Sequence, residues 1–379
     1  QGDVHDFEKI KEEVISNNIS LVFVGPEDPI VNGIYDFFKS DNSLKKIKII
    51  APSKRAGRLE GSKEFAKKFM ERYNIPTAKH GTFTRDNIDQ AYMFLDNMSS
   101  PYVLKADGLA AGKGVLIIHD LEEAKQELRS MIFDKKFGES SSKVVIEEFL
   151  DGIELSCFVL TDGNNYKILP FAKDYKKIGE ADTGLNTGGM GAISPVVFLD
   201  DVFLEKIEER VIKPTINGIM KENMEYMGIV FIGLIKVNED PYVIEYNVRM
   251  GDPETEVVFP RIENDLLELF NSMGSTEFAN IDLIVDERHA ATVIMVSGGY
   301  PINYEKNKVI TGIENITDSI VFHAGTKKDD NLYLTNGGRV LAITSLAKNY
   351  KEAIGLSYKQ IEKISFEKAY FRKDIGFDL

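Results

Sequence analysis

The chain is poor in cysteine and histidine, and these shortages exclude several kinds of site. Its 379 residues include one cysteine, Cys157, and five histidines. A single thiol rules out an intrachain disulfide and suits a reducing compartment. Cys157 lies in the strand-like run 153–160, so we expect a buried structural thiol and not a nucleophile. The histidines and the cysteine show no zinc-ligand spacing.

Long apolar runs and basic patches are also missing. No run approaches the ~18 apolar residues of a membrane-spanning helix, and no secretory signal opens the chain. We therefore expect a cytoplasmic protein with no membrane contact. The formal net charge of −14 argues against a nucleic-acid binder, because such proteins carry a basic surface.

The first sixty residues alternate helix-like and strand-like segments. Helices are predicted at 6–17 and 31–38, and strands at 19–24 and 48–51. This alternation predicts a parallel α/β layer, in which ligands bind beyond the carboxyl ends of the strands. The segment 25–29 follows the first strand and is therefore a candidate ligand loop, although a simple tight turn fits it equally well.

The strand-like stretch 241–249 carries three polar side chains at alternate positions. Glu245, Asn247 and Arg249 should share one face of the strand. Burying them without partners is costly. Carboxylate and amide oxygens suit Mg²⁺, and a guanidinium suits phosphate oxygens, so a metal-bound polyphosphate would partner all three. We expect Ile244, Val243 and Val248 to be buried, and this expectation, with the specific order of acid, amide and arginine, argues against the alternative of a solvated surface strand.

A glycine-rich segment, 107–114, joins two predicted strands at 101–106 and 115–118. It lacks the G-x-x-x-x-G-K-[ST] order of a P-loop. Its backbone N–H groups can still lie over phosphates, and Lys105 and Lys113 would add positive charge. A flexible surface hairpin is the alternative.

The predicted strand 143–150 ends in two acids that face opposite ways. Whichever of Glu147 and Glu148 looks inward could accept the exocyclic amine of adenine, and the following backbone could read the ring edge. Glu154 is placed to bond ribose hydroxyls. A salt bridge to a neighbouring strand is the alternative for each glutamate. The predicted nucleotide contacts are Glu147, Glu148, Phe149, Leu150 and Glu154.

The segment 173–191 is polar and has no periodicity. We predict a loop, and loops of this length inside a compact domain are often functional. Its glycine-rich end, 187–191, would let backbone approach a small substrate closely. Disorder is the alternative.

The remaining segments complete the expected layout. Residues 53–73 should form a helix broken near Gly61, with three lysines on the outward face of its second part. The helix at 202–223 should kink at Pro214. From His289 onward, short strands and turns predict a separate mixed α+β domain of about ninety residues.

In this order, the parts resemble the ATP-grasp superfamily, in which ATP lies between two α+β subdomains. Over its whole length the chain is similar to the phosphoribosylamine–glycine ligase (glycinamide ribonucleotide synthetase) family. The motifs that carry the resemblance are Val24–Pro29, Leu59–Lys63, Lys105–Val115, Asp182–Gly191, Arg249–Glu254, Ser297–Pro301, Asn336–Arg339 and Arg372–Leu379.

The resemblance implies an α/β and α+β multidomain protein with an ATP-grasp fold. We expect an N-terminal parallel α/β domain at 1–60, an ATP-grasp domain at 61–286 with a mobile lid at about 79–147, and a C-terminal α+β domain at 287–379. The family normally opens with another βα unit whose glycine-rich loop helps to hold the ribosyl phosphate. This sequence begins at Gln1, so we expect that unit to be absent from it.

The resemblance also implies ligation of glycine to 5-phosphoribosylamine with hydrolysis of ATP, through glycyl phosphate, by a monomer that uses Mg²⁺ or Mn²⁺. Another ATP-grasp carboxylate–amine ligase and an inactive ATP-binding form stay open. The implied catalytic residues are Arg249, Asp252 and Glu254, and the metal ligands Glu245 and Asn247. ATP contacts are expected from Lys105, Gly108, Gly112, Lys113 and Gly114 besides the segment around Glu147. The implied substrate contacts are Gly25, Pro26, Glu27, Asp174, Asn186, Thr187, Gly188 and Gly189.

Overall fold

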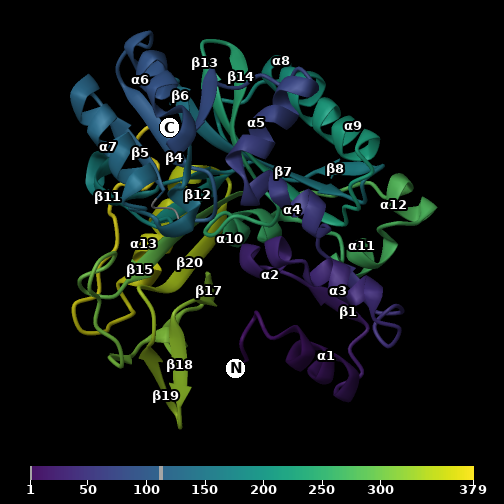
Figure 1. The fold of residues 1–379 in the computed structure, drawn as a ribbon. Helices are drawn as coiled ribbons and strands as arrows, with labels where there is room; N and C mark the ends of the chain where they lie inside the picture. The colour runs from purple at the N-terminus through teal and green to yellow at the C-terminus, as the bar shows by residue number, and fades with distance from the viewer. Residues whose placement is uncertain (1, 111–113) are drawn as a thin grey trace.

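The structure, a computed structural model, describes residues 2–110 and 114–379 and consists of several sheets with helices packed on them (Figure 1). The N-terminal elements are α1 (Phe7–Ser16), β1 (Leu21–Phe23), α2 (Glu27–Asn32), α3 (Ile34–Ser40), β2 (Lys48–Ile50) and α4 (Lys54–Gly61). Strands β1 and β2 pair in parallel, which confirms the predicted parallel layer.

The predicted helix at 31–38 is wrong in its bounds. Gly33 has a φ of 95°, which separates α2 from α3, and glycine tolerates this left-handed backbone. Helix α2 already begins at Glu27, with Pro26 before its first turn. The candidate loop at 25–29 is therefore mostly the start of a helix.

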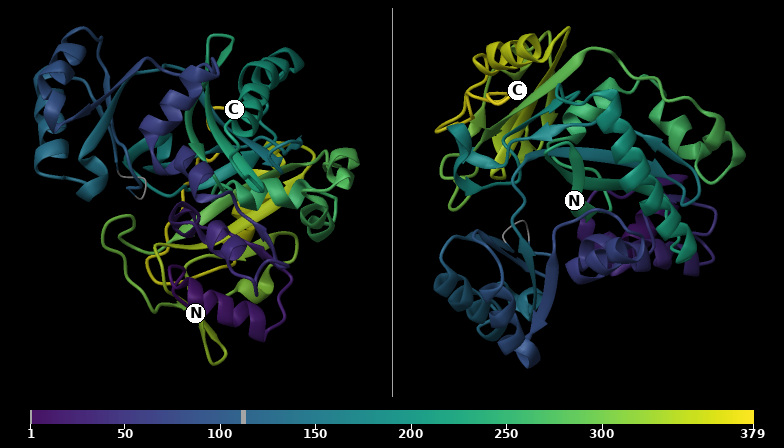
Figure 2. Two further views of the ribbon diagram at one scale, coloured as in Figure 1. Left: turned by 45° about the vertical axis from the view of Figure 1, so that its right-hand side comes forward. Right: turned by 90° about the horizontal axis from the view of Figure 1, so that it is seen from above.

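A four-stranded antiparallel sheet forms the subdomain at 80–148, which stands apart from the rest of the molecule in the left view of Figure 2. Its order is β3-β6-β4-β5, and it has its own hydrophobic core under two helices. The predicted hairpin of β4 and β5 is confirmed. The elements are β3 (His80–Thr84), α6 (Ile88–Asp96), β4 (Tyr102–Ala106), β5 (Val115–Ile118), α7 (Leu121–Phe133) and β6 (Lys143–Glu148).

The central sheet has the order β14-β13-β7-β8 and is antiparallel throughout. Its strands are β7 (Ile153–Thr161), β8 (Tyr166–Ile168), β13 (Gly228–Val237) and β14 (Asp240–Asn247). Helix α5 (Lys63–Arg72) follows α4 after the predicted break near Gly61. Cys157 is fully buried in β7, as predicted.

The predicted kink at Pro214 takes another form. Helix α8 (Asp201–Ile207) runs into a π-helical turn at 208–212, and α9 (Lys213–Lys221) then carries Pro214 in its first turn. In a regular α-helix the proline ring would clash with the carbonyl four residues earlier, and the π-helical turn that runs directly into α9 widens the helix just before Pro214. The irregularity therefore precedes the proline.

The segment 173–191 is not a structureless loop. It contains β9 (Lys173–Asp174), a hairpin of β10 (Lys177–Gly179) and β11 (Thr183–Asn186), and the start of β12 (Gly191–Ser194). Strands β9 and β12 extend the sheet of the C-terminal region, whose order is β17-β20-β15-β12-β9. The prediction missed them because β12 pairs with β15, about a hundred residues away in sequence, and β9 joins the sheet through β12.

The C-terminal region is mixed α+β, as predicted. Its elements are β15 (His289–Val296), β16 (Val309–Ile310), β17 (Ile320–His323), β18 (Thr326–Asp329), β19 (Leu332–Thr335), β20 (Arg339–Ala347) and α13 (Tyr350–Ile361). Short helices α10 (Thr255–Val258), α11 (Leu266–Ser272) and α12 (Thr276–Asn280) precede it. In the part of the chain that the structure describes, no helix is both long and apolar enough to cross a membrane.

Candidate active site

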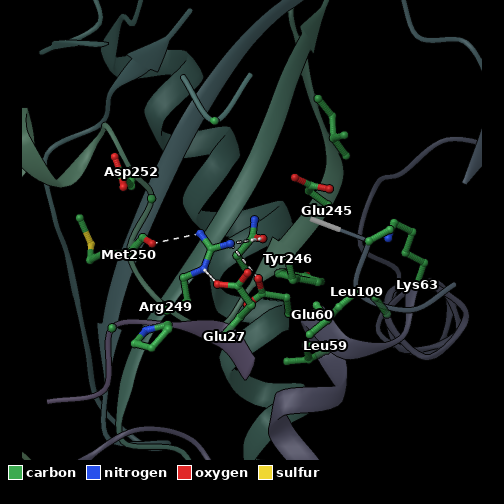
Figure 3. Close-up of a pocket in the computed structure, with 18 of the residues that line it drawn as sticks. Glu27, Leu59, Glu60, Lys63, Leu109, Glu245, Tyr246, Arg249, Met250 and Asp252 are labelled. Atoms are coloured by element: carbon green, nitrogen blue, oxygen red, sulfur yellow. Dashed lines mark hydrogen bonds and ion pairs between the residues drawn. The ribbon is translucent and has the colours of Figure 1, made fainter. Parts of the chain in front are cut away.

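The end of β14 opens into a cleft of about 810 Å³. Glu245, Asn247 and Arg249 all line this cleft, so the predicted polar row faces one space. Figure 3 labels Glu245 and Arg249 in it. The pairing of β13 with β14 shifts register between Gly233 and Leu234. This irregularity turns Ile244 toward the cleft as well, where it is half-buried. Val243 and Val248 are buried, as expected. The expectation is wrong for Ile244, because the strand does not alternate regularly at this point.

Arg249 is held by two acids from the N-terminal region. Its guanidinium lies 2.9 Å from Oε1 of Glu60 on α4 and 3.4 Å from Oε2 of Glu27 on α2. Glu60 also accepts the N–H of Val248 at 2.8 Å. Burial raises the pKa of Glu60 to about 7, against the opposing effects of Arg249 and of this hydrogen bond. The first domain thus fixes the arginine at the end of β14.

Glu245 and Asn247 have the chemistry of a divalent-metal site. Asn247 is buried, and its Oδ1 lies 3.5 Å from an Arg249 nitrogen. Within the described ranges, no Lys, Arg or His forms an ion pair with the half-buried carboxylate of Glu245. A carboxylate and an amide oxygen facing a common cleft suit Mg²⁺ or Mn²⁺. Among the residues that the structure describes, histidine, cysteine and acidic side chains form no cluster of three or more that could hold a metal ion.

Glu147 is the inward acid of β6, and it forms the salt bridge that was the alternative interpretation. Its Oε2 lies 3.0 Å from the amine of Lys105 on β4 and 3.0 Å from that of Lys67 on α5. Burial pushes the pKa of Glu147 upward, but the two lysines outweigh it and the pKa is lowered. In the described part of the chain, Oε1 of Glu147 has no hydrogen-bond partner. The acid, Lys67 and the cleft therefore meet at one place.

The prediction that all three lysines of helix α5 face outward is wrong for Lys67. Its side chain is 2% exposed, and besides Glu147 it reaches Oγ1 of Thr77 at 2.7 Å. Lys68, the next residue, is 59% exposed. Lys67 lies three residues before the buried Met70 and so shares its side of the helix, and the acid on β6 makes its burial tolerable.

The segment after Glu147 lies at the edge of the subdomain at 80–148. Glu148 is half-buried and accepts the N–H of Lys79 at 2.8 Å. Phe149 is exposed and Leu150 is half-buried. Glu154 is exposed and lies 3.2 Å from the amine of Lys176.

The glycine hairpin contributes to the cleft through Leu109, Ala110 and Gly114. Gly108 lies behind it, where an added Cβ would meet Oγ of Ser140 at 2.8 Å. The predicted contacts Gly112 and Lys113 lie outside the described residues.

The opposite wall holds most of the predicted substrate contacts. Gly25, Pro26, Glu27, Thr187, Gly188 and Asp252 line the cleft. Gly189 lies against Pro253, where an added Cβ would meet Cδ at 2.2 Å. Asn186 is exposed at the end of β11.

Asp174 and Glu254 lie beside the main cleft and not among its lining residues. Asp174 borders a small hollow that shares Ile244 and Glu245 with the cleft. Glu254 is buried and accepts a hydrogen bond from Ser156 Oγ at 2.9 Å. Burial, with Asp174 nearby, raises the pKa of Glu254 to about 7.

Five charged residues that line the cleft in the described part of the chain were assigned no role from the sequence. They are Glu60, Lys63, Lys67, Glu256 and Arg339. Glu60 and Lys63 belong to the motif 59–63, and Arg339 belongs to the motif 336–339, so a charged residue inside each motif was the available signal. Glu256 lies two residues after the motif 249–254, and Lys67 lies outside the motifs.

Comparison with known proteins accounts for nearly the whole chain. Three family models match it: phosphoribosylglycinamide synthetase N domain at 1–60, ATP-grasp (A) domain at 61–255 and C domain at 290–378. It is 44% identical over 368 residues to a phosphoribosylamine–glycine ligase of Fusobacterium nucleatum, covering 96% of this chain and 84% of that protein. It is 43% identical to the ligase of that name from Caldanaerobacter subterraneus, covering 98% and 88%.

Solved structures agree in fold. The crystal structure of a phosphoribosylamine–glycine ligase from Thermotoga maritima superposes with a TM-score of 0.79 at 37% identity, covering 86% of this chain and 81% of that one. A biotin carboxylase domain from Hydrogenobacter thermophilus, in complex with MgADP and bicarbonate, has a TM-score of 0.71 at 17% identity, covering 96% and 78%. The second likeness concerns the fold alone.

Proposed function

The chain belongs to the phosphoribosylglycinamide synthetase family, and from that premise we propose that it ligates glycine to 5-phosphoribosylamine. ATP is consumed, and glycinamide ribonucleotide, ADP and phosphate are formed, a reaction of purine biosynthesis. The observation that carries the proposal is the content of one cleft. The cleft brings the polar row at the end of β14 together with Lys63, Gly114, Glu147, Thr187, Gly188 and Asp252.

The reaction proceeds in two displacements. A carboxylate oxygen of glycine attacks the γ-phosphorus of ATP, so that ADP leaves and glycyl phosphate forms. The amine nitrogen of phosphoribosylamine then attacks the glycyl carbonyl carbon, loses a proton and expels phosphate. Neither step needs a protein nucleophile, so positioning and charge neutralisation carry the catalysis.

Positively charged side chains from three parts of the chain would face the phosphates of ATP. We propose that Glu245 and Asn247 hold Mg²⁺ or Mn²⁺, which neutralises charge on the β- and γ-phosphates when bound. Arg249 stabilises the phosphoryl group during transfer. Lys63, Lys105 and the hairpin 107–114 cover the remaining phosphate oxygens. Burial lowers the pKa of Lys63, and the phosphates would favour its charged form.

The end of β6 and the segment after it would bind the adenine and the ribose of ATP. Oε2 of Glu147 is occupied by two lysines, so Oε1 is the oxygen that would accept the exocyclic amine of adenine. The backbone of Phe149 and Leu150, next to Glu148, would read the ring edge, and Glu154 would bond the ribose. Closure of a lid at 79–147 would exclude water and protect the acyl phosphate.

The substrate side lies toward the N-terminal and C-terminal domains. We propose that Asp252, Glu254 and the loop 186–189 orient glycine and the amine, with Gly25, Pro26, Glu27 and Asp174 bordering the same space. The protein would act as a monomer in the cytoplasm, where its single thiol would stay reduced. Size-exclusion chromatography with light scattering would test the oligomeric state.

The decisive experiment is magnesium-dependent ADP release by this chain. Release that requires both glycine and phosphoribosylamine supports the proposal, and equal release with D-alanine or bicarbonate contradicts it in favour of another ATP-grasp ligase. Glu245→Ala and Arg249→Ala should each abolish turnover. ATP binding without turnover in the presence of both substrates would instead identify an inactive binding form.

A further inference from the structure

Two short motifs of the C-terminal domain have no role in the chemistry above. They are 297–301 and 336–339, and the structure packs them together. Ser297 donates from its backbone N–H to Gly338 O at 2.8 Å and from its hydroxyl to Gly337 O at 2.8 Å. The ring of Tyr300 lies so close to Gly338 that an added Cβ there would meet it at 2.2 Å. Together the motifs present Tyr300 and Arg339 to the substrate side of the cleft.

These two side chains form hydrogen bonds with the backbone of Gly188, one with its N–H and the other with its carbonyl group. The Gly188 N–H donates to Oη of Tyr300 at 3.0 Å, and the Gly188 carbonyl accepts from Nη1 of Arg339 at 2.6 Å. An added Cβ at Gly188 would lie 2.8 Å from Cζ of Arg339. A residue without a side chain is required for the guanidinium to come this close.

The neighbouring amides are used within the protein too. The N–H of Thr187 donates to Lys176 O at 2.7 Å, and that of Gly189 donates to Oγ1 of Thr187 at 3.0 Å. Three consecutive N–H groups are thus satisfied before any substrate binds. The loop 187–189 is therefore a preformed wall of the cleft, and its position depends on the groups that hold it.

Arg339 holds a second piece of the same wall. Its Nη1 donates to the carbonyl of Asp252 at 2.9 Å, and its Nη2 donates to Oδ2 of Asp252 at 2.8 Å. One guanidinium therefore sets the spacing between Gly188 and Asp252, both of which line the cleft. A planar fork can do this, whereas the ammonium of a lysine is a single point of attachment.

We propose that Arg339 and Tyr300 are positioning residues through which the C-terminal domain fixes the site for glycine and phosphoribosylamine, and not the site for ATP. The proposal rests on the proposed function. Asp252 lies across the cleft from Lys63 and Glu245, which face the phosphates in that proposal (Figure 3). Loosening the wall at Gly188 should therefore leave nucleotide binding intact.

The test uses the full chain with Tyr300→Phe, Arg339→Lys and Arg339→Met, and with Lys348→Met as the control for charge loss in the same domain. Lys348 is 79% exposed, and among the described residues it forms an ion pair with Glu352 alone. We expect kcat/KM for glycine and phosphoribosylamine to fall roughly 10- to 100-fold in both Arg339 variants and roughly tenfold in Tyr300→Phe. The Kd of ATP should stay within about twofold, because its contacts lie on the other wall.

The double variant Tyr300→Phe/Arg339→Met should lose less than the product of the two single losses, because both residues hold the backbone of Gly188. Kinetic loss accompanied by an equal loss of ATP binding would overturn the positioning role, as would unchanged use of both substrates in Arg339→Met. Full activity in Arg339→Lys would overturn the requirement for a fork.

Amide hydrogen exchange separates this proposal from the proposed function. A peptide covering 186–191 should exchange faster in Tyr300→Phe and Arg339→Met than in the wild type and in Lys348→Met, whether or not the protein turns over. Unchanged exchange overturns the positioning role of Tyr300 and Arg339. Absence of wild-type turnover with glycine and phosphoribosylamine overturns the proposed function, and accelerated exchange would still support the positioning role.

Discussion

Two buried glutamates on different walls of the cleft have pKa values that are shifted in opposite directions. Glu147 faces two lysines, and their charges lower its pKa in spite of burial. Glu60 faces Arg249 at 2.9 Å and one backbone N–H, and burial raises its pKa to about 7. The first site keeps a carboxylate charged in the interior, and the second holds a carboxyl that titrates near neutrality. The number of cations around a buried acid decides which outcome prevails.

Among the changes considered for these two glutamates, Glu147→Gln should lower the free energy of unfolding most. The change leaves the amines of Lys67 and Lys105 buried without an anion, and an uncompensated buried charge costs about 3–5 kcal/mol of the free energy of unfolding. Urea unfolding followed by circular dichroism measures the loss. Glu148→Gln is the matched control, because that half-buried side chain accepts a hydrogen bond from a backbone N–H and from no other group of the described residues. This change should cost about 1 kcal/mol. Equal losses in the two variants would show that the lysines do not depend on Glu147.

Lys67→Met breaks the same site from the other side. Glu147 keeps Lys105 as a partner, and methionine fills much of the space, so we expect a loss of about 1–3 kcal/mol. The pKa of Glu147 should rise, because one of its two opposing charges is gone. Lys68→Met is the control, since Lys68 makes an exposed pair with Glu64 worth about 0.3–0.5 kcal/mol. A loss no larger than that of the control would mean that burial of Lys67 is not coupled to stability.

The stability of the wild type and that of Glu60→Gln should depend differently on pH. The pKa of Glu60 is raised from 4.5 to about 7 on folding, so the folded protein binds this proton more tightly than the unfolded chain does. The resulting stability is fully present below pH 4.5 and is lost as the pH rises through 7. The wild type should therefore lose on the order of 1–3 kcal/mol relative to Glu60→Gln between pH 5 and pH 8. Unfolding free energies of both proteins at the two pH values measure this difference, and parallel pH profiles would contradict it.

Much of the fold was predictable from local patterns. The strand β14, the hairpin of β4 and β5, the break near Gly61 and the mixed C-terminal region follow from apolar periodicity and glycine placement. Helix bounds near Gly33 and Pro214 were not predicted correctly. There the backbone conformation of one residue, or a π-helical turn before a proline, decided the outcome.

The sequence by itself determined the chemical inventory and its order along the chain. The polar row of Glu245, Asn247 and Arg249 predicted its own common face, and the order of the motifs predicted the family. Both depend on neighbours close in sequence, where strand and helix periods apply directly.

Only the tertiary structure decided which charges meet. Lys67 could not be assigned to the interior until β6 brought Glu147 against it, and Arg339 could not be connected to Gly188 across about 150 residues. Strands β9 and β12 likewise exist because the C-terminal sheet accepts them. Such contacts depend on which surfaces come together on folding, and the cost of burying an ion without its partner makes each of them specific.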